Sequence, residues 1–182
     1  QDLSTYRGPL NLSEFEIELS EPHDLALLGG MTRIFYLNLT SCAISDAVLG
    51  SSLAYLWHLK TFIACGNNIS DLTPLAVLTT LTELDLTGNR SIVSIEPLRA
   101  LVRVKKLLIS LCSITSLAPL DNMCALETLK AYNNKLCSGT KNTSKNDLLA
   151  LVNMPNLRDI DLHGNCIQDA TPLSILKFHS VN

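Results

Sequence analysis

The stretch from Leu59 to Leu78, LKTFIACGNNISDLTPLAVL, decides the fold of this chain. With Leu59 taken as offset 0, apolar residues stand at offsets 0, 3, 5, 10, 13, 16 and 19, Asn67 stands at offset 8 and Pro74 at offset 15. At Leu81, 22 residues after Leu59, the same spacing begins again. A spacing that restarts in this way indicates a protein built from internal repeats.

The spacing recurs through most of the chain. Working outward from the clearest copy gives seven copies, which start at residues 12, 34, 59, 81, 104, 126 and 157. The copy at 34 is lengthened to 25 residues, and the copy at 126 contains a polar insertion at about 137–146. We therefore divide the chain into an N-terminal lead-in over 1–11 and one repeat domain over 12–182. Residue 179 would open an eighth copy.

The pattern predicts one coil of an α/β solenoid per copy. Side chains at offsets 3 and 5 alternate as in a strand and point inward, while those at offsets 2, 4 and 6 point outward. The Asn at offset 8 can satisfy backbone groups where the chain turns away, and the Pro suits the start of a short helical stretch. Because one coil cannot bury its own apolar edge, stability must come from stacked neighbours. We expect a parallel sheet on the concave face and short helical, 3-10 or extended segments on the convex face.

The pattern L-x-x-L-x-L-x-x-N-x-I-x-D-L-x-P-L resembles the SDS22-like class of leucine-rich repeats over about residues 12–178. That class includes a phosphatase-1 regulatory subunit, an axonemal dynein light chain and the bacterial internalins. The resemblance implies a horseshoe-shaped solenoid of about seven repeats that binds another protein and needs no cofactor. All matched positions are scaffold, so the resemblance singles out no member of the class.

Specificity in such a solenoid lies on the outward strand positions of the concave face. Ile63 and Leu108 are apolar where an idle face would be polar, and Tyr36 and Tyr132 are of a type enriched at protein interfaces. We predict a partner-binding surface centred on residues 83–132. Its candidate residues are Tyr36, Ile63, Glu83, Asp85, Lys106, Leu108, Lys130, Tyr132, Asp159, Asp161 and His163.

Composition and motifs argue against catalysis, nucleic-acid binding and membrane insertion. A net charge of −3 leaves no basic field for a nucleic acid, and no apolar run reaches the length of a membrane span. The sequence holds no nucleophile elbow, zinc-protease motif or phosphate loop. Asp159, Asp161 and His163 superficially resemble a metal set, but on one strand the outer pair lies about 13 Å apart at the backbone. We expect no enzyme, no cofactor and no metal site.

The six cysteines bear on the compartment. They are scattered, usually one per repeat, and Cys42 and Cys112 replace the Asn at offset 8, where burial would make them inert. Neither end shows a cysteine-rich cap, so we expect reduced thiols and an intracellular protein of the cytoplasm or nucleus. Five N-x-S/T sequons, at Asn11, Asn38, Asn68, Asn89 and Asn142, argue the other way.

The leading hypothesis is a protein-binding adaptor or regulatory subunit, with phosphatase regulation as one form of that role. A structural component of a cytoskeletal or axonemal assembly is a second hypothesis, and a secreted internalin-like surface adhesin is a third. No polar cap closes the C-terminal edge in the sequence. Since solenoids need their last apolar edge covered, we expect that edge to be covered by further sequence, by a partner, or by self-association with a second copy.

Overall fold

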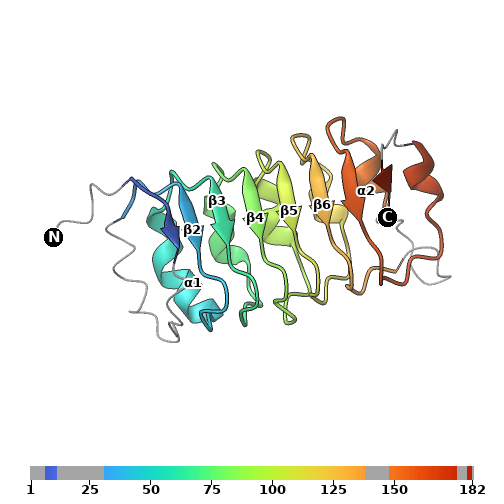
Figure 1. The fold of residues 1–182 in the computed structure, drawn as a ribbon. Coiled ribbons are helices and arrows are strands. Elements are labelled where there is room, and N and C mark those ends of the chain that lie inside the picture. Colours follow the sequence, from blue (N-terminus) through green and yellow to red (C-terminus); the bar gives the residue numbers. More distant parts are fainter. Residues whose placement is uncertain (1–6, 12–30, 138–147, 176–179, 182) are drawn as a thin grey trace.

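The computed structural model describes residues 7–11, 31–137, 148–175 and 180–181. Eight parallel strands form one sheet in which each strand pairs with the next along the chain. Figure 1 shows the strands side by side along an elongated stack, with the helical segments behind them. β1 and β8 lie at its opposite ends. The predicted α/β solenoid, with a parallel sheet on one side and short helical segments on the other, is confirmed.

The strands are short and in register. Tyr36, Thr61, Glu83, Lys106, Thr128 and Asp159 follow one another across the sheet at the first strand position, which is offset 2 of each copy. The strands are β1 (Leu10–Asn11), β2 (Tyr36–Asn38), β3 (Thr61–Ile63), β4 (Glu83–Asp85), β5 (Lys106–Leu108), β6 (Thr128–Lys130), β7 (Asp159–Asp161) and β8 (Ser180–Val181).

The convex side consists mostly of single 3-10 turns. In η5 (Thr73–Val77), η6 (Glu96–Ala100) and η7 (Ala118–Leu120) a proline occupies the first or second position, where its missing N–H costs no hydrogen bond. The remaining helical segments are α1 (Asp46–Ser52), η4 (Leu53–Tyr55), α2 (Leu149–Val152) and η8 (Thr171–Ile175). The longer copy at 34 uses its extra residues for α1, the longest helix in the described part of the chain.

The core runs the length of the stack between the sheet and these turns. In the coil that starts at Leu81, Leu84 and Leu86 at offsets 3 and 5 are fully buried. Leu81 itself, Ile95 at offset 14 and Leu98 at offset 17 are buried with them. Equivalent residues in neighbouring coils continue a single apolar cluster. Each coil thus buries its apolar edges against its neighbours, as the repeat logic predicts.

The asparagines at offset 8 form the predicted ladder. The Asn67 side chain donates to the carbonyl oxygens of Leu39 and Ala64 at 2.8 and 3.0 Å, and its oxygen accepts from the backbone N–H of Ile44 at 2.9 Å. Asn89 is fully buried and donates in the same way to Leu86 and Ala64. Each amide therefore satisfies backbone groups that the turn leaves unpaired in its own coil and the preceding one.

Two details differ from the sequence expectations. β1 lies at Leu10–Asn11, inside the expected lead-in, and Leu10 pairs with Leu37, so the strand at this end precedes the copy assigned to residue 12. Ser180 and Val181 form an eighth strand on β7, one beyond the seven assigned copies. Residues 12–30 and nearly all of the 137–146 insertion lie outside the described residues.

Candidate functional site

The outward side chains of the strands form three rows across the sheet. The middle row brings Ile63, Asp85 and Leu108 side by side on adjacent strands, because the register pairs them directly. All three are half-buried. Apolar and charged side chains therefore alternate at the centre of the face, where a partner could cover both kinds of group.

Two ion pairs connect neighbouring strands on this face. Lys106 Nζ lies 2.6 Å from Glu83 Oε1, and this hydrogen bond raises the pKa of Lys106, so the lysine stays charged. Lys130 Nζ lies 2.6 Å from Asp159 Oδ1, across the long insertion in the sequence. Both lysines are thus already paired with acids of this surface, and each pair is partly exposed. Such pairs add little stability but hold long side chains in place.

A stacked pair of rings lies toward the C-terminal end of the face. The rings of Tyr132 and His163 stack with centroids 4.8 Å apart and planes at 5°. His163 Nδ1 lies 2.6 Å from Asp161 Oδ1, and the backbone N–H of His163 donates to the same carboxylate. Burial raises the pKa of Asp161, but these hydrogen bonds outweigh burial and lower it overall. The result is a fixed aromatic platform beside a carboxylate.

The remaining outward positions differ in their exposure. Tyr36, on β2, is half-buried at the opposite end of the sheet from His163. Ser110, which follows β5, is fully buried, and its hydroxyl accepts from the backbone N–H of Tyr132. Burial, together with Asp85, raises the pKa of the Cys65 thiol to about 12, which keeps it protonated and unreactive at neutral pH.

Asp159, Asp161 and His163, which superficially resemble a metal set in the sequence, have other partners in the structure. Asp161 and His163 bond to each other, while Asp159 pairs with Lys130. Among the described residues, no group of three His, Cys, Asp or Glu side chains is placed to hold a metal ion. Within the same residues, no helix combines the length and apolarity needed to cross a membrane.

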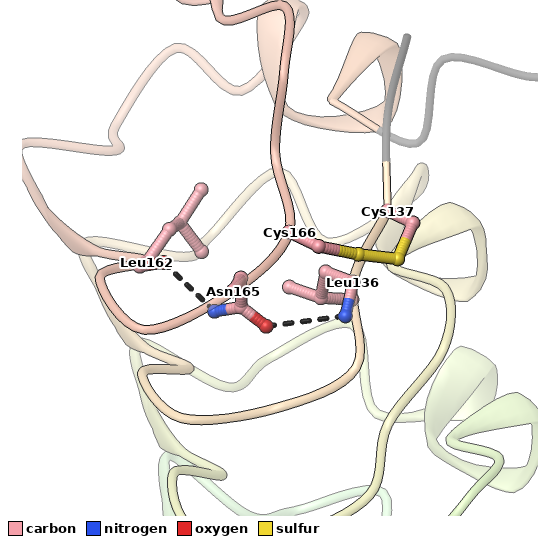
Figure 2. The surroundings of a disulfide bond; sticks show 5 residues. All are labelled: Leu136, Cys137, Leu162, Asn165 and Cys166. Atoms are coloured by element: carbon pink, nitrogen blue, oxygen red, sulfur yellow. Dashed lines mark hydrogen bonds between the residues drawn. A yellow bond between two sulfur atoms is a disulfide. The ribbon is translucent and has the colours of Figure 1, made fainter. Parts of the chain in front are cut away.

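The cysteines divide into two groups, which corrects the expectation that all six are reduced. Cys137 and Cys166 form a disulfide with their Cα atoms 4.7 Å apart, and Figure 2 shows it beside Asn165 of the ladder. The side-chain oxygen of Asn165 accepts from the backbone N–H of Leu136, and the backbone N–H of Cys166 donates to the carbonyl oxygen of Leu136. These two hydrogen bonds hold the two segments together. The other four are free, and Cys42 and Cys112 are buried as expected. Burial raises the pKa of both thiols, that of Cys112 to about 11.

The sequence did not reveal this pair because the two cysteines occupy different offsets, 11 and 9, in consecutive copies. Stacking the copies by offset does not place them together. The pairs Lys130–Asp159 and Tyr132–His163 were missed for a related reason, since each joins two residues separated by the insertion. All four of those residues were predicted to lie on the face, but their contacts were not predicted.

Comparison with known proteins agrees with the repeat architecture. A family described as leucine-rich repeats (2 copies) matches residues 57–100. The molecule is a leucine-rich-repeat solenoid. Domains of this fold generally bind other proteins and typically act as non-enzymatic modules. No curated protein sequence is significantly similar to the chain.

Solved structures resemble the solenoid over most of its length. Internalin F from Listeria monocytogenes is 27% identical with a TM-score of 0.72, and the match covers 85% of this chain and 44% of internalin F. This chain therefore spans less than half of that protein. The leucine-rich-repeat ectodomain of the receptor kinase SOBIR1 from Arabidopsis thaliana is 24% identical with a TM-score of 0.53; the match covers 71% of this chain and 70% of the ectodomain. The second likeness concerns the fold alone.

Proposed function

We propose that the solenoid binds a partner protein across its concave face, centred on residues 83–132, and serves as an adaptor or regulatory subunit. The observation that carries the proposal is the central row, in which Ile63 and Leu108 flank Asp85 at half-buried, outward positions. Protein interfaces typically combine apolar side chains with polar and charged groups, as this row does. Regulation of a phosphatase, implied by the SDS22-like pattern, is one form of this role.

A matched pair of substitutions tests the location of the binding surface. Leu108→Arg places a charge in the central row, while Val93→Arg makes a similar change at a residue that is 51% exposed and lies outside the strands. Partners captured from cell extracts are identified by mass spectrometry, and each is then purified and its Kd measured. We expect Leu108→Arg to weaken binding at least tenfold, or by about 1.4 kcal/mol, and Val93→Arg to leave it unchanged. Equal affinities for the two variants would contradict the proposal.

The disulfide favours a second candidate, a secreted or surface-exposed binding protein. The expectation of an intracellular protein rested on reduced thiols, and the Cys137–Cys166 bond removes that support because disulfides persist mainly in oxidising compartments. The 27% identity to internalin F is consistent with the internalin-like alternative. This proposal concerns the compartment and leaves the binding face unchanged.

Thiol labelling in intact cells tests the compartment. Cells that express the protein naturally are treated with an alkylating reagent under denaturing conditions, and the mass of the protein is measured. The mass is measured again after reduction and a second alkylation. An oxidised pair leaves four alkylated cysteines at first and adds two more after reduction, in line with the four free cysteines and one disulfide. Six alkylated cysteines before reduction would instead support the intracellular prediction.

A further inference from the structure

A second surface runs along the edge of the solenoid where the chain enters each strand. We call it the entry edge and define it as the residues at offsets −1 and 1. Residues at offset 1 of neighbouring coils lie next to one another, because backbone hydrogen bonds connect them. The N–H groups of Lys60, Lys105 and Glu127 each donate to the carbonyl oxygen of the offset-1 residue in the preceding coil. The cations of the entry edge are Arg33, Lys60, Arg103, Lys105 and Arg158.

The charge of the entry edge is positive, although the whole chain carries a net charge of −3. In the described part of the chain, Glu127 is the acid at these offsets, and its carboxylate lies 2.9 Å from Lys105. The acids at offset 12 of their coils, Asp46 and Asp71, stand on a different part of the surface. Among the described residues, no acid at offsets −1 or 1 neutralises the positive charge in the N-terminal half of the entry edge.

A hollow of about 350 Å³ opens at the N-terminal end of the entry edge, and Arg7, Arg33 and His58 line it. Its volume lies near the lower end of the roughly 300–1,000 Å³ typical of small-ligand pockets. Leu10 pairs with Leu37, which brings the segment containing Arg7 alongside the coil containing Arg33. Three cationic or potentially cationic side chains thus come from three separate segments to one hollow.

Among the described residues, Arg7 and Arg33 form no ion pair, in contrast with Arg99, which contacts two carboxylates at 2.8 Å. A guanidinium stays charged at any ordinary pH, so two of them at one hollow repel each other. Arginine also presents a planar fork of N–H donors that matches the oxygens of a phosphate or sulfate group.

His58 is oriented for the same task. Its Nδ1 lies 3.2 Å from the carbonyl oxygen of Thr32, and since a carbonyl only accepts, Nδ1 carries the proton and donates. That bond fixes the ring and leaves Nε2 for a ligand, as a second donor when the ring is protonated. The residue before His58 in the sequence is Trp57, the only tryptophan of the chain, with 60% of its surface exposed.

We propose that the hollow lined by Arg7, Arg33 and His58 is a binding site for a tetrahedral oxyanion, the phosphate or sulfate group of a ligand. The site is separate from the concave face and would act alongside partner binding there. Lys60 and Arg103 extend it along the entry edge and would attract an anionic ligand that continues beyond the first group.

Trp57 gives the experiment a built-in reporter. The purified protein is titrated with sodium phosphate and, in a second series, with sodium sulfate, each against sodium chloride at matched ionic strength. Trp57 fluorescence and the melting temperature are followed together. We expect a saturable response and a rise in melting temperature with at least one oxyanion, and neither with chloride, since a ligand that binds only the folded state stabilises it. The oxyanion that acts identifies the group.

The variants locate the site. Arg7→Gln combined with Arg33→Gln should weaken oxyanion binding at least tenfold, whereas Lys135→Gln, which removes an exposed charge after β6, should leave it unchanged. Melting temperatures without ligand show whether each variant is folded. Three results would overturn the proposal: no response to either oxyanion by both measurements, the same response to chloride, or equal affinity in the double variant and the wild type.

Discussion

At offset 7, directly before the asparagine ladder, every coil from the second to the last has one residue in the left-handed backbone region. Glycine fills this position at Gly66, Gly88 and Gly164, and Asn133, a residue type that tolerates this region, fills it once. Ser41 and Leu111 fill the other two with φ of 56° each. The conformation comes from the tight turn that every coil must make, and it persists where the side chain disfavours it.

Leu111→Gly is therefore expected to stabilise the protein. A left-handed L-residue costs roughly 1–2 kcal/mol, and the greater freedom of glycine in the unfolded chain offsets part of the gain, so we expect a net increase of about 0.5–1 kcal/mol. Leu111 is 38% exposed, so little packing is lost. Urea denaturation gives the free energy of unfolding. Val102→Gly, at an exposed residue without a positive φ, should lower it, and a Leu111→Gly protein no more stable than wild type would refute the argument.

The elements of this protein are too short to be stable alone, so contacts between coils hold them. Strands of two or three residues form only because each pairs with its neighbours. Asp46, at the start of α1, shows the same dependence, because its carboxylate accepts from the Ser70 hydroxyl and from the backbone N–H of Ser70 and Asp71, the last two at 2.7 and 2.9 Å. It joins the second coil to the third. Burial raises the pKa of Asp46, but these hydrogen bonds lower it overall.

The Asp46 contact should make stability depend on acid pH. A carboxyl whose pKa is lower in the folded than in the unfolded state stabilises the fold above the unfolded pKa, and that contribution is lost as pH falls through the folded pKa. Asp46→Asn should thus be less stable than wild type at pH 7, and the difference should shrink below about pH 4. Denaturant titrations across this range measure both. Ser70→Ala should reduce the same pH dependence, and parallel profiles for wild type and Asp46→Asn would contradict the assignment.

For the whole molecule, stability is a sum over neighbouring coils, since a coil contacts little beyond the one before and the one after. The Cys137–Cys166 disulfide connects the last two full coils, on either side of the long insertion. Its sequence separation is 29 residues, for which the loop-entropy model gives a stabilisation of roughly 3–4 kcal/mol. The bond thus links two coils that the insertion separates in the sequence.

Reduction should loosen one end of the solenoid and leave the other intact. We expect faster amide hydrogen exchange in β6 and β7 after treatment with a phosphine reductant, while β3 and β4 stay protected. The double variant Cys137→Ser with Cys166→Ser should show the faster exchange without reductant and no further change with it. Uniform acceleration along the chain would mean that the coils unfold as one unit.

The local repeat determined much of this architecture. Offsets 3 and 5, the Asn at offset 8 and the Pro at offset 15 each act within one coil or between adjacent coils, and the structure confirms their roles at Leu84, Asn67 and Pro74. The same alternation predicted which side chains stand on the concave face. These features follow from short-range spacing, which a sequence displays directly.

Only the tertiary structure decided what depends on register between distant segments. The disulfide, the Tyr132–His163 stack and the Lys130–Asp159 pair all span the insertion, whose length hides the alignment of the coils on either side. The strand at Leu10–Asn11 does not follow the spacing of the assigned copies, so only its pairing with β2 reveals it. The hollow of Arg7, Arg33 and His58 arises in the same way, because its charges converge only when three segments stack. The sequence thus specified the repeated coil, whereas stacking decided which side chains of different coils meet.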